Sequence, residues 1–307
     1  MRTVIVGQGA IGLLCYHRFS LVNLPGNNYS VSLWPSTACE VSHYSFKEMN
    51  SKTKSFPLSM AGRKELASAQ LIVICVKSYQ VKKALQSIHA LIADNAVIIL
   101  THNGLGTFEE ISHLLKTTQC LLTLLLTQGA RKVADYHIEH TGMGNSDLGL
   151  IFGQLTSTKQ AQTVDYFQQG LQQIYWQEDI KQAQWQKLAI NCVINPLTAL
   201  KNMPNGDINQ HVYQEKVRQV IREVVQAAAK EEVTLSESSL LKLIKSVAHN
   251  TENNISSMRA DIIASRRTEI DYINGYVHRL GGKHQLATPN NTQLWLDIKA
   301  LEDGFNV

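Results

Sequence analysis

A glycine-rich motif close to the start of the chain has the spacing of a phosphate-binding loop. It consists of Gly7, Gln8, Gly9, Ala10, Ile11 and Gly12. The motif follows a short β-branched run and opens a stretch with helical character, which is the setting that dinucleotide-binding loops require. The first glycine permits a tight turn, the second lets a pyrophosphate approach, and the third lets helix and strand pack closely. The motif therefore predicts a dinucleotide site at a helix N-terminus, and a plain glycine turn is the alternative.

The end of the second predicted strand should select the dinucleotide. An acid there would bind the ribose hydroxyls of NAD, whereas an arginine would hold the additional phosphate of NADP. This sequence has Trp34, Pro35, Ser36 and Thr37 at that point. The hydroxyl groups of Ser36 and Thr37 offer hydrogen bonds to a phosphate without a positive charge. The missing acid favours NADPH, and NADH stays open.

A polar stripe on an otherwise apolar segment is the second candidate for chemistry. Lys187, Asn191 and Asn195 recur every four residues, so a helix places them on one face. The residues between them are mostly apolar, which predicts a helix buried on most sides. We expect the stripe to face a polar cleft, and a narrow solvated stripe is the alternative. A lysine so placed can protonate the oxygen of a ketone that receives a hydride, while asparagines hold the substrate.

Elements that would position these groups follow from the hydrophobic pattern. The first half alternates apolar runs at 3–6, 29–34, 71–76, 96–100 and 121–127 with helical stretches at 11–22 and 80–91. Strands that are apolar along their whole length indicate a mostly parallel sheet covered on both faces. Two later runs, 135–140 and 148–152, are separated by a glycine-rich segment and are predicted to form a hairpin that closes the sheet.

Strand signals stop after about residue 177. Helices are predicted from there on, at 181–200, 212–230, 238–248, 257–280 and 291–302. The predicted fold is therefore an α/β Rossmann domain over residues 1–177, followed by an all-α helical domain over residues 178–307.

Composition excludes several classes of protein. The net charge is +4 and no block of basic residues occurs, so neither nucleic acid nor a membrane surface is an expected partner. The chain contains no long apolar run and no room for a signal peptide before the first glycine. Five widely spaced cysteines predict reduced thiols in a cytoplasmic protein. His137, Glu139 and His140 lack the spacing of a metalloprotease motif, and no metal is expected.

Several motifs in the same order resemble those of the ketopantoate reductase family. Besides the glycine loop, they are the segments VKSYQ at 76–80, HNGLG at 102–106, the run from Lys187 through NPLTA at 195–199 to PNG at 204–206, NISSM at 254–258 and TEIDYING at 268–275. Together they cover most of the chain, and those of the helical half are more specific than the glycine loop. The resemblance implies a Rossmann domain, a helical domain and an active site in the cleft between them.

The resemblance also implies roles for individual residues. Lys187 matches the family's catalytic lysine, and Glu269 matches an acid that supports the lysine and contacts substrate or cofactor. Substrate-binding positions are matched by Asn103, Asn191, Asn195, Asn205 and Ser257. Asn103 also matches a residue that meets the nicotinamide, and Lys77 and Ala130 match cofactor contacts. Family members often carry an arginine where this chain has Ser36.

Simpler interpretations exist for four of these residues. Lys77 and Asn103 each follow a buried strand, where ligands bind in open α/β sheets, but a solvated strand end is the alternative. Ser257 stands where a helix N-cap is expected. Glu269 lies near Arg266, Arg267 and Asp271, so an exposed ion-pair cluster is its default interpretation.

The expected activity is the NADPH-dependent reduction of 2-dehydropantoate (ketopantoate) to pantoate, a step toward pantothenate and coenzyme A. A reductase of another 2-oxo acid is the first alternative, because groups that hold a carboxylate and a hydroxyl suit several such acids. A non-catalytic NADP(H) sensor is the second, although a sensor needs neither Lys187 nor Glu269. The partner is a small-molecule 2-oxo acid, and the protein is expected to be a monomer or homodimer.

Overall fold

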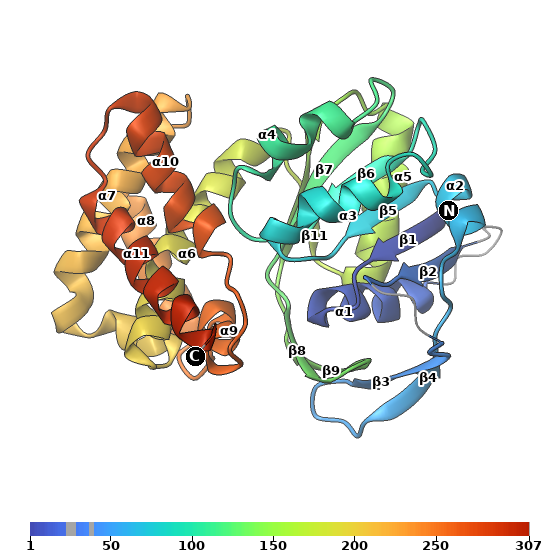
Figure 1. Cartoon of the computed structure of the whole chain (residues 1–307), viewed down its shortest axis with the longest axis horizontal. Coiled ribbons are helices and arrows are strands. Elements are labelled where there is room, and N and C mark those ends of the chain that lie inside the picture. Colours follow the sequence, from blue (N-terminus) through green and yellow to red (C-terminus); the bar gives the residue numbers. More distant parts are fainter. Residues whose placement is uncertain (23–28, 37–39, 307) are drawn as a thin grey trace. The chain divides into compact units, whose positions relative to one another are not determined.

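The computed structural model describes residues 1–22, 29–36 and 40–306 and forms two compact units (Figure 1). The first unit comprises Met1–His102 and Glu109–Ile180. The second comprises Asn103–Phe108 and Lys181–Val307. The short segment at 103–108 therefore belongs to the helical unit, although it directly follows a strand of the first unit.

The first unit is built on a seven-stranded sheet in the order β11-β10-β7-β6-β5-β1-β2. Its strands are β1 (Arg2–Val6), β2 (Ser30–Trp34), β5 (Leu71–Ile74), β6 (Val97–Leu100), β7 (Cys120–Leu126), β10 (Ser146–Phe152) and β11 (Ile174–Trp176). The five strands from β7 to β2 run parallel, and β10 is antiparallel to β7. This confirms the predicted mostly parallel sheet.

Helices cover both faces of this sheet. The helices are α1 (Ala10–Ser20), α2 (Arg63–Ser68), α3 (Val81–Ile88), α4 (Thr107–Ile111) and α5 (Ser157–Leu171). Alternate strand residues such as Ile5, Val73 and Ile99 join the core that contains Phe19 of α1 and Tyr166 of α5. Figure 1 shows α1 and α3 on opposite sides of the sheet. The chain thus leaves β1 in one direction to β2 and returns to β5 on the other side, which makes the β1/β5 boundary a topological switch point.

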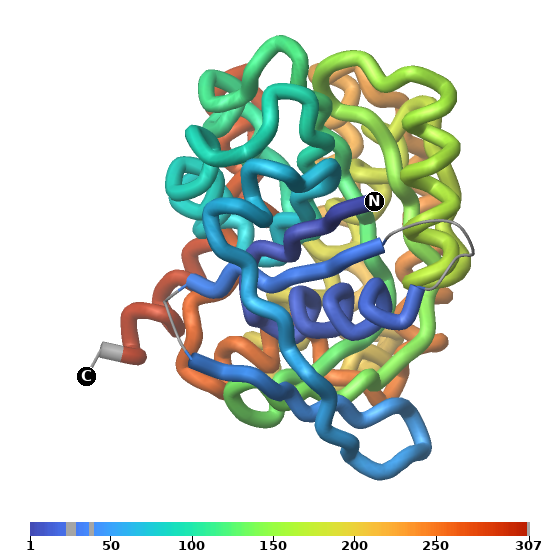
Figure 2. The backbone as a smooth tube through the Cα atoms, turned by 90° about the vertical axis from the view of Figure 1, so that its right-hand side faces the viewer, coloured from blue at the N-terminus to red at the C-terminus, as the bar shows by residue number. Residues whose placement is uncertain are grey.

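A second, four-stranded sheet was not expected from the sequence. It has the order β4-β3-β9-β8 and comprises β3 (His43–Lys47), β4 (Lys54–Pro57), β8 (Gly129–Ala134) and β9 (His137–Gly142). Figure 2 shows the light-blue β3–β4 segment beside the green β8–β9 segment. The hairpin predicted from 135–140 and 148–152 is wrong, because β9 pairs with β8 and β3 whereas β10 pairs with β7. The glycine-rich segment between β9 and β10 carries the chain from one sheet to the other.

Helices make up the second unit, as predicted. They are α6 (Ile180–Lys201), α7 (Gln214–Lys230), α8 (Glu237–Asn250), α9 (Ser257–Ile263), α10 (Asn274–His284) and α11 (Pro289–Asp303), with short 3₁₀ turns η3 (Asn205–Asn209), η4 (His211–Tyr213), η5 (Ile270–Tyr272) and η6 (Gly304–Asn306). The first unit also contains two 3₁₀ turns, η1 (Ser78–Gln80) before α3 and η2 (Ser112–Leu114) after α4. Central residues of α6, among them Leu188, Cys192 and Val193, lie in the core of this unit.

The single helix predicted at 257–280 is wrong, since the structure divides this stretch into α9, η5 and α10. Helix α9 ends at Ile263 with Ala264 as its C-cap, and the next residue, Ser265, has a φ of 49°, which a right-handed helix does not allow. The apolar periodicity continues across the break because both sides face the same core. Glu269 lies in the non-helical segment that results.

Candidate functional site

Two glycines of the predicted phosphate loop lie where the backbone leaves room for no side chain. Gly7 has a φ of 107°, and a Cβ atom on it would come within 2.8 Å of the Cys75 carbonyl oxygen. A Cβ atom on Gly12 would lie 1.9 Å from the carbonyl oxygen of Gly7. Gly7 thus makes the turn out of β1, and Gly12 lets α1 pack directly against that turn.

The middle glycine differs, because its surroundings are open. A Cβ atom on Gly9 would have its nearest described neighbour, the Cys75 carbonyl oxygen, at 3.9 Å. Gly9 is the N-cap of α1, and the first turn contains no acidic residue. Backbone N–H groups and the positive end of the helix dipole are therefore combined with space above the backbone, which suits a pyrophosphate.

Ser36 lies beside this loop and is held by it. The Gln8 side-chain amide donates to the Ser36 hydroxyl at 2.9 Å, and the Ser36 backbone N–H donates to Gln8 Oε1 at 2.9 Å. The Gly7 N–H also donates to the carbonyl oxygen of Trp34. The end of β2 and the glycine loop therefore form one connected surface. Thr37 lies outside the described residues.

The two other predicted cofactor contacts of the first unit occupy different places. Lys77 follows β5 and precedes η1, and the residues just before it, Cys75 and Val76, line the turn at Gly7. Lys77 therefore directly follows the residues that contact the phosphate loop, at the switch point of the sheet. Ala130 lies on β8 of the second sheet, where it pairs with His140 and is partly buried.

In the second unit, α6 carries the polar stripe. Lys187 and Asn191 are partly buried, and Asn195 is 6% exposed. The stripe thus runs from partly open to enclosed, which a simply solvated helix face would not do. Asn191 Nδ2 is buried and makes no hydrogen bond within the described residues. A buried donor of this kind needs a partner, and a substrate carboxylate would supply one.

Asn103 and Glu269 are brought together although they are far apart in sequence. The Asn103 side-chain amide donates to Glu269 Oε2 at 3.1 Å, and the Asn103 backbone N–H donates to Oε1 at 3.3 Å. Glu269 is 5% exposed. The exposed ion-pair cluster considered for this residue is therefore wrong. Its charged neighbours form the ion pairs Arg266–Asp261 and Arg267–Asp271.

The backbone on both sides of this contact is fixed. The Thr268 N–H and hydroxyl both donate to Glu302 Oε1 of α11, each at 2.7 Å. The Leu105 N–H donates to the Tyr272 carbonyl oxygen at 2.8 Å, and a Cβ atom on Gly104 would lie only 2.2 Å from that oxygen. The segment at 103–105 can approach the 269–272 segment this closely because residue 104 is glycine.

The other carboxylate of this segment, Asp271, has partners of its own. Burial would raise its pKa, but hydrogen bonds from Trp295 and Arg267, together with the nearby Lys299 ammonium, lower the pKa below its usual value. Asp271 therefore stays ionised and engaged by these partners. Glu269 is the other carboxylate of this segment, and its side chain accepts from Asn103.

Asn205 presents a buried acceptor. Its Nδ2 donates to the Thr251 hydroxyl at 3.1 Å, and that hydroxyl in turn donates to the Val247 carbonyl oxygen at 2.7 Å. Because the Thr251 hydrogen is committed, the amide is oriented with its nitrogen toward Thr251. Asn205 Oδ1 is buried and has no hydrogen-bond partner within the described residues. A substrate hydroxyl would satisfy it.

Ser257 is not the N-cap of its helix. The cap of α9 is Ser256, whose hydroxyl accepts from the Arg259 N–H and lies 2.7 Å from the Thr198 hydroxyl of α6. Ser256 is buried and Ser257 is exposed. The capping interpretation of Ser257 is therefore wrong by one residue, and its hydroxyl stays available to solvent or to a ligand.

Sequence reasoning missed the residues that support the site, namely Thr251, Ser256, Thr198 and Glu302. The adjacent serines at 256 and 257 signalled a cap but not which of them provides it. Thr251 and Glu302 carried no local signal, because each acts on a residue more than thirty positions away along the chain.

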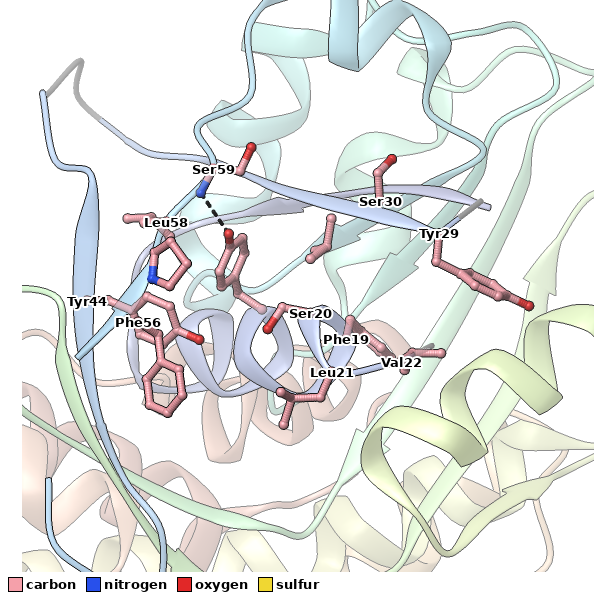
Figure 3. Close-up of a pocket in the computed structure, with 13 residues that line it drawn as sticks. Phe19, Ser20, Leu21, Val22, Tyr29, Ser30, Tyr44, Phe56, Leu58 and Ser59 are labelled. Atoms are coloured by element: carbon pink, nitrogen blue, oxygen red, sulfur yellow. Dashed lines mark hydrogen bonds between the residues drawn. The ribbon is translucent and has the colours of Figure 1, made fainter. Parts of the chain in front are cut away.

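A separate pocket of about 620 Å³ lies at the C-terminal end of α1, opposite the end that carries the glycine loop (Figure 3). Its walls are largely apolar and aromatic, with Phe19, Tyr44 and Phe56 among them. The Tyr16 hydroxyl accepts from the Ser59 N–H there, at 2.7 Å. Its place on α1 distinguishes this pocket from the predicted nucleotide site.

The described residues contain neither a cluster of metal-ligating side chains nor a helix fit to cross a membrane. No group of three or more His, Cys, Asp or Glu side chains in the described ranges is arranged to hold a metal ion. Among the described helices, none is both long and apolar enough to span a membrane. The four described cysteines are buried free thiols, and Cys39 lies outside the described residues.

Comparison with known proteins gives matches along the whole chain. The family model of the ketopantoate reductase PanE/ApbA matches residues 3–152, and the model of its C-terminal part matches residues 179–302. A 2-dehydropantoate 2-reductase of Vibrio cholerae is 32% identical over 314 residues, covering 100% of this chain and 99% of that protein. One from Yersinia pestis is 32% identical over 308 residues, covering 99% and 96%.

Solved structures share the fold. D-mandelate dehydrogenase with NADH and anilino(oxo)acetate superimposes with a TM-score of 0.87 at 23% identity, over the whole of both chains. A dimeric ketopantoate reductase from Staphylococcus aureus has a TM-score of 0.81 at 21% identity, covering 99% of this chain and 100% of that one. The two family models and the full-length relatives show that this chain belongs to the ketopantoate reductase family.

Proposed function

We propose that the protein reduces 2-dehydropantoate to pantoate, with NADPH as the hydride donor. The observation that carries this proposal is the set of groups in the second unit: a lysine, a buried carboxylate, a buried amide donor and a buried amide acceptor. Family membership and the names of the full-length relatives support the choice of this keto acid among 2-oxo acids.

The residues of the first unit fit a dinucleotide. Gly9 leaves open the space that a pyrophosphate would fill, and the N-terminus of α1 directs its N–H groups there. When bound, the nicotinamide supplies the hydride that reduces the substrate's keto carbon. Lys77, which follows the residues that line the turn at Gly7, would add a positive charge for the phosphates.

Lys187 would donate the proton. As the hydride adds to the keto carbon, negative charge develops on the keto oxygen, and an ammonium group nearby stabilises that charge and transfers a proton to the oxygen. The products are the hydroxy acid and the oxidised dinucleotide. Glu269, which Asn103 holds in a buried position, would orient the Lys187 ammonium and keep it charged.

The asparagines would hold the rest of the substrate. Asn191 offers a buried N–H group to the carboxylate, and Asn205 offers a buried carbonyl oxygen to the hydroxyl at the other end of ketopantoate. An amide neither gives up nor takes a proton near neutral pH, so these contacts do not compete with Lys187 for the transferred proton. Asn195 and Ser257 complete the proposed set.

The choice between NADPH and NADH depends on Ser36. Its hydroxyl already accepts a hydrogen bond from Gln8, and it brings no charge to a ribose phosphate. NADH use is therefore the second candidate, favoured by this specific contact. NADPH is proposed first because the missing acid removes the group that would bind the ribose hydroxyls of NADH.

An absorbance assay of nicotinamide oxidation tests substrate and cofactor together. The purified protein is assayed with ketopantoate and with a panel of other 2-oxo acids, each with NADPH and with NADH. We expect kcat/KM for ketopantoate to exceed that of the other acids by more than about tenfold. A preference of tenfold or less would count against ketopantoate, and NADPH binding without any turnover would favour a sensor.

A further inference from the structure

Helix α6, which carries the polar stripe, contains a proline in its interior. Pro196 has no backbone N–H group, so the carbonyl group four residues earlier, that of Cys192, loses its helical donor. The ring of a proline also presses against that carbonyl and turns it outward. Cys192 is 0% exposed, so its carbonyl needs a donor from another part of the protein.

Asn274, the first residue of α10, supplies that donor. Its Nδ2 lies 3.0 Å from the Cys192 carbonyl oxygen and 3.0 Å from Asn291 Oδ1. Both hydrogens of the amide nitrogen are therefore used. The side chain is 0% exposed, and its Oδ1 atom is buried without a hydrogen-bond partner in the described part of the chain. Leaving the Asn274 Oδ1 atom without a donor has an energetic cost, which an apolar side chain at this position would avoid. An apolar side chain, however, could not donate to the Cys192 carbonyl, as the Asn274 amide does.

The orientation of Asn274 is itself determined by two further residues. Asn291 donates through both its backbone N–H and its Nδ2 to Glu223 Oε2, each at 2.8 Å. A carboxylate only accepts, so Glu223 fixes the nitrogen of the Asn291 amide on its own side and leaves Oδ1 facing Asn274. Glu223 of α7 is 6% exposed and also accepts from the N–H of Asn290 at the start of α11. Glu223 thus fixes the orientation of the Asn291 amide, and Asn291 in turn fixes the Asn274 amide with its nitrogen toward the Cys192 carbonyl oxygen.

The broken turn of α6 is also the turn that contains Asn195. Lys187 and Asn191 precede Cys192, so they lie on the intact part of the helix, whereas Asn195 lies between Cys192 and Pro196. A helix bends where its hydrogen-bond ladder is interrupted. The direction of the Asn195 side chain relative to Lys187 and Asn191 thus depends on what holds the Cys192 carbonyl.

We infer that Asn274 is a positioning residue for the keto acid substrate. By closing the turn that Pro196 leaves open, it sets Asn195 at the angle at which the three groups of the stripe meet one substrate. This inference rests on the proposed function, because it concerns the same site. The competing interpretation is a core hydrogen bond that contributes only to folding stability.

A double-mutant cycle between Asn274 and Pro196 distinguishes the positioning role from a purely stabilising hydrogen bond. Asn274→Ala leaves the Cys192 carbonyl without a donor, and we expect KM for ketopantoate to rise about tenfold while kcat falls less than about threefold. Pro196→Ala restores the helical N–H group, so that in this background Asn274→Ala should raise KM by less than about twofold. The KM for NADPH should not change in any of the variants.

Val277→Ala is the matched control. Val277 is also fully buried on α10, one turn after Asn274, and belongs to the same core. We expect this variant to lower the thermal unfolding midpoint as Asn274→Ala does, with KM for ketopantoate unchanged. An equal rise of KM in the control, or equal effects of Asn274→Ala in both backgrounds, would overturn the inference. If Asn274→Ala does not fold, Asn291→Leu removes the support of the amide instead, and an unchanged KM in that variant would overturn the inference as well.

Calorimetric titration of the NADP⁺-loaded protein with pantoate gives a readout that does not need turnover. A wild-type protein that binds pantoate but does not reduce ketopantoate contradicts the proposed function alone, and the cycle is then measured on the pantoate Kd. A wild-type protein that turns over normally, with additive effects of the two substitutions on KM and Kd, contradicts the positioning role alone.

Discussion

The glycine loop of the first unit and the polar site of the second are built by opposite means. The loop uses backbone groups of residues that are contiguous in sequence, and its glycines matter because they have no side chain. The polar site uses side chains from separate segments, of which the Asn103–Glu269 contact is one example. A local motif is enough for the first kind of site, whereas the second exists only once the chain has folded.

This difference leads to different kinds of support. Around the loop, support is mostly steric, as in the approach of Gly12 to the Gly7 carbonyl. Around the polar site, support comes from hydrogen bonds between distant elements, as in the double donation from Thr268 to Glu302. We therefore expect substitutions at the loop to act by filling space that the backbone or the cofactor needs. Substitutions at the polar site should act by changing the direction of the side chains that contact the substrate.

The largest effect is expected from Lys187→Ala. Removing the proton donor should lower kcat with ketopantoate by about 10³-fold, since positioned acids contribute roughly 10²- to 10⁴-fold. The NADPH Kd, measured by fluorescence titration, should stay within about twofold, because Lys187 belongs to the helical unit.

Lys201→Ala serves as the control for this variant. Lys201 is an exposed lysine at the other end of the same helix, so its removal changes the net charge equally. It should leave kcat unchanged. Full turnover by Lys187→Ala would assign the proton donor to another residue.

The sequence alone predicts the parts of this molecule that depend on short-range order. The parallel strands, the glycine loop and the helices of the second unit follow from apolar runs and their periods. The β3–β4 and β8–β9 sheet does not, because its strands are only partly buried and its central pair, β3 and β9, joins distant segments. The break between α9 and α10 was missed for the opposite reason, since apolar spacing continues through it.

For the site, local pattern and family resemblance contributed different residues. The spacing of Lys187, Asn191 and Asn195 indicated a common helix face, which the structure confirms as one helix. Glu269, judged by its charged neighbours alone, was expected to be exposed, and only the resemblance singled it out. Its hydrogen-bond partner Asn103 lies 166 positions away, so no pattern within its own segment could show this contact.

Substitutions at Gly9 and Gly12 should impair different properties of the protein, cofactor binding at Gly9 and folding stability at Gly12. Gly9 has a φ of −72°, which alanine adopts, and open space around its Cβ position. Gly9→Ala should therefore leave the unfolding midpoint unchanged but raise the NADPH Kd by about 10- to 100-fold, because the methyl group fills the place of the pyrophosphate.

Gly12→Ala should act on stability as well. Its Cβ atom would overlap the Gly7 carbonyl oxygen, so α1 must move away from the turn, at a cost of about 1–3 kcal/mol in the free energy of unfolding. Thermal unfolding and NADPH titration of both variants check the contrast. If Gly9→Ala bound NADPH like the wild type, the pyrophosphate would not lie over Gly9.

The smallest effect is expected where a residue acts only by orienting another. Thr251→Val removes the acceptor that fixes the Asn205 amide, so Asn205 Oδ1 would no longer be held toward the substrate hydroxyl. Losing one such hydrogen bond should raise KM for ketopantoate by up to about tenfold, with little change in kcat. Thr251→Ser keeps the hydroxyl and should behave like the wild type.

Because Asn205→Ala removes the acceptor itself, its KM should rise at least as far as that of Thr251→Val. A rise in KM for Asn205→Ala together with a normal KM for Thr251→Val would show that Asn205 acts without this orientation, and that the polar site tolerates more side-chain freedom than its hydrogen bonds indicate.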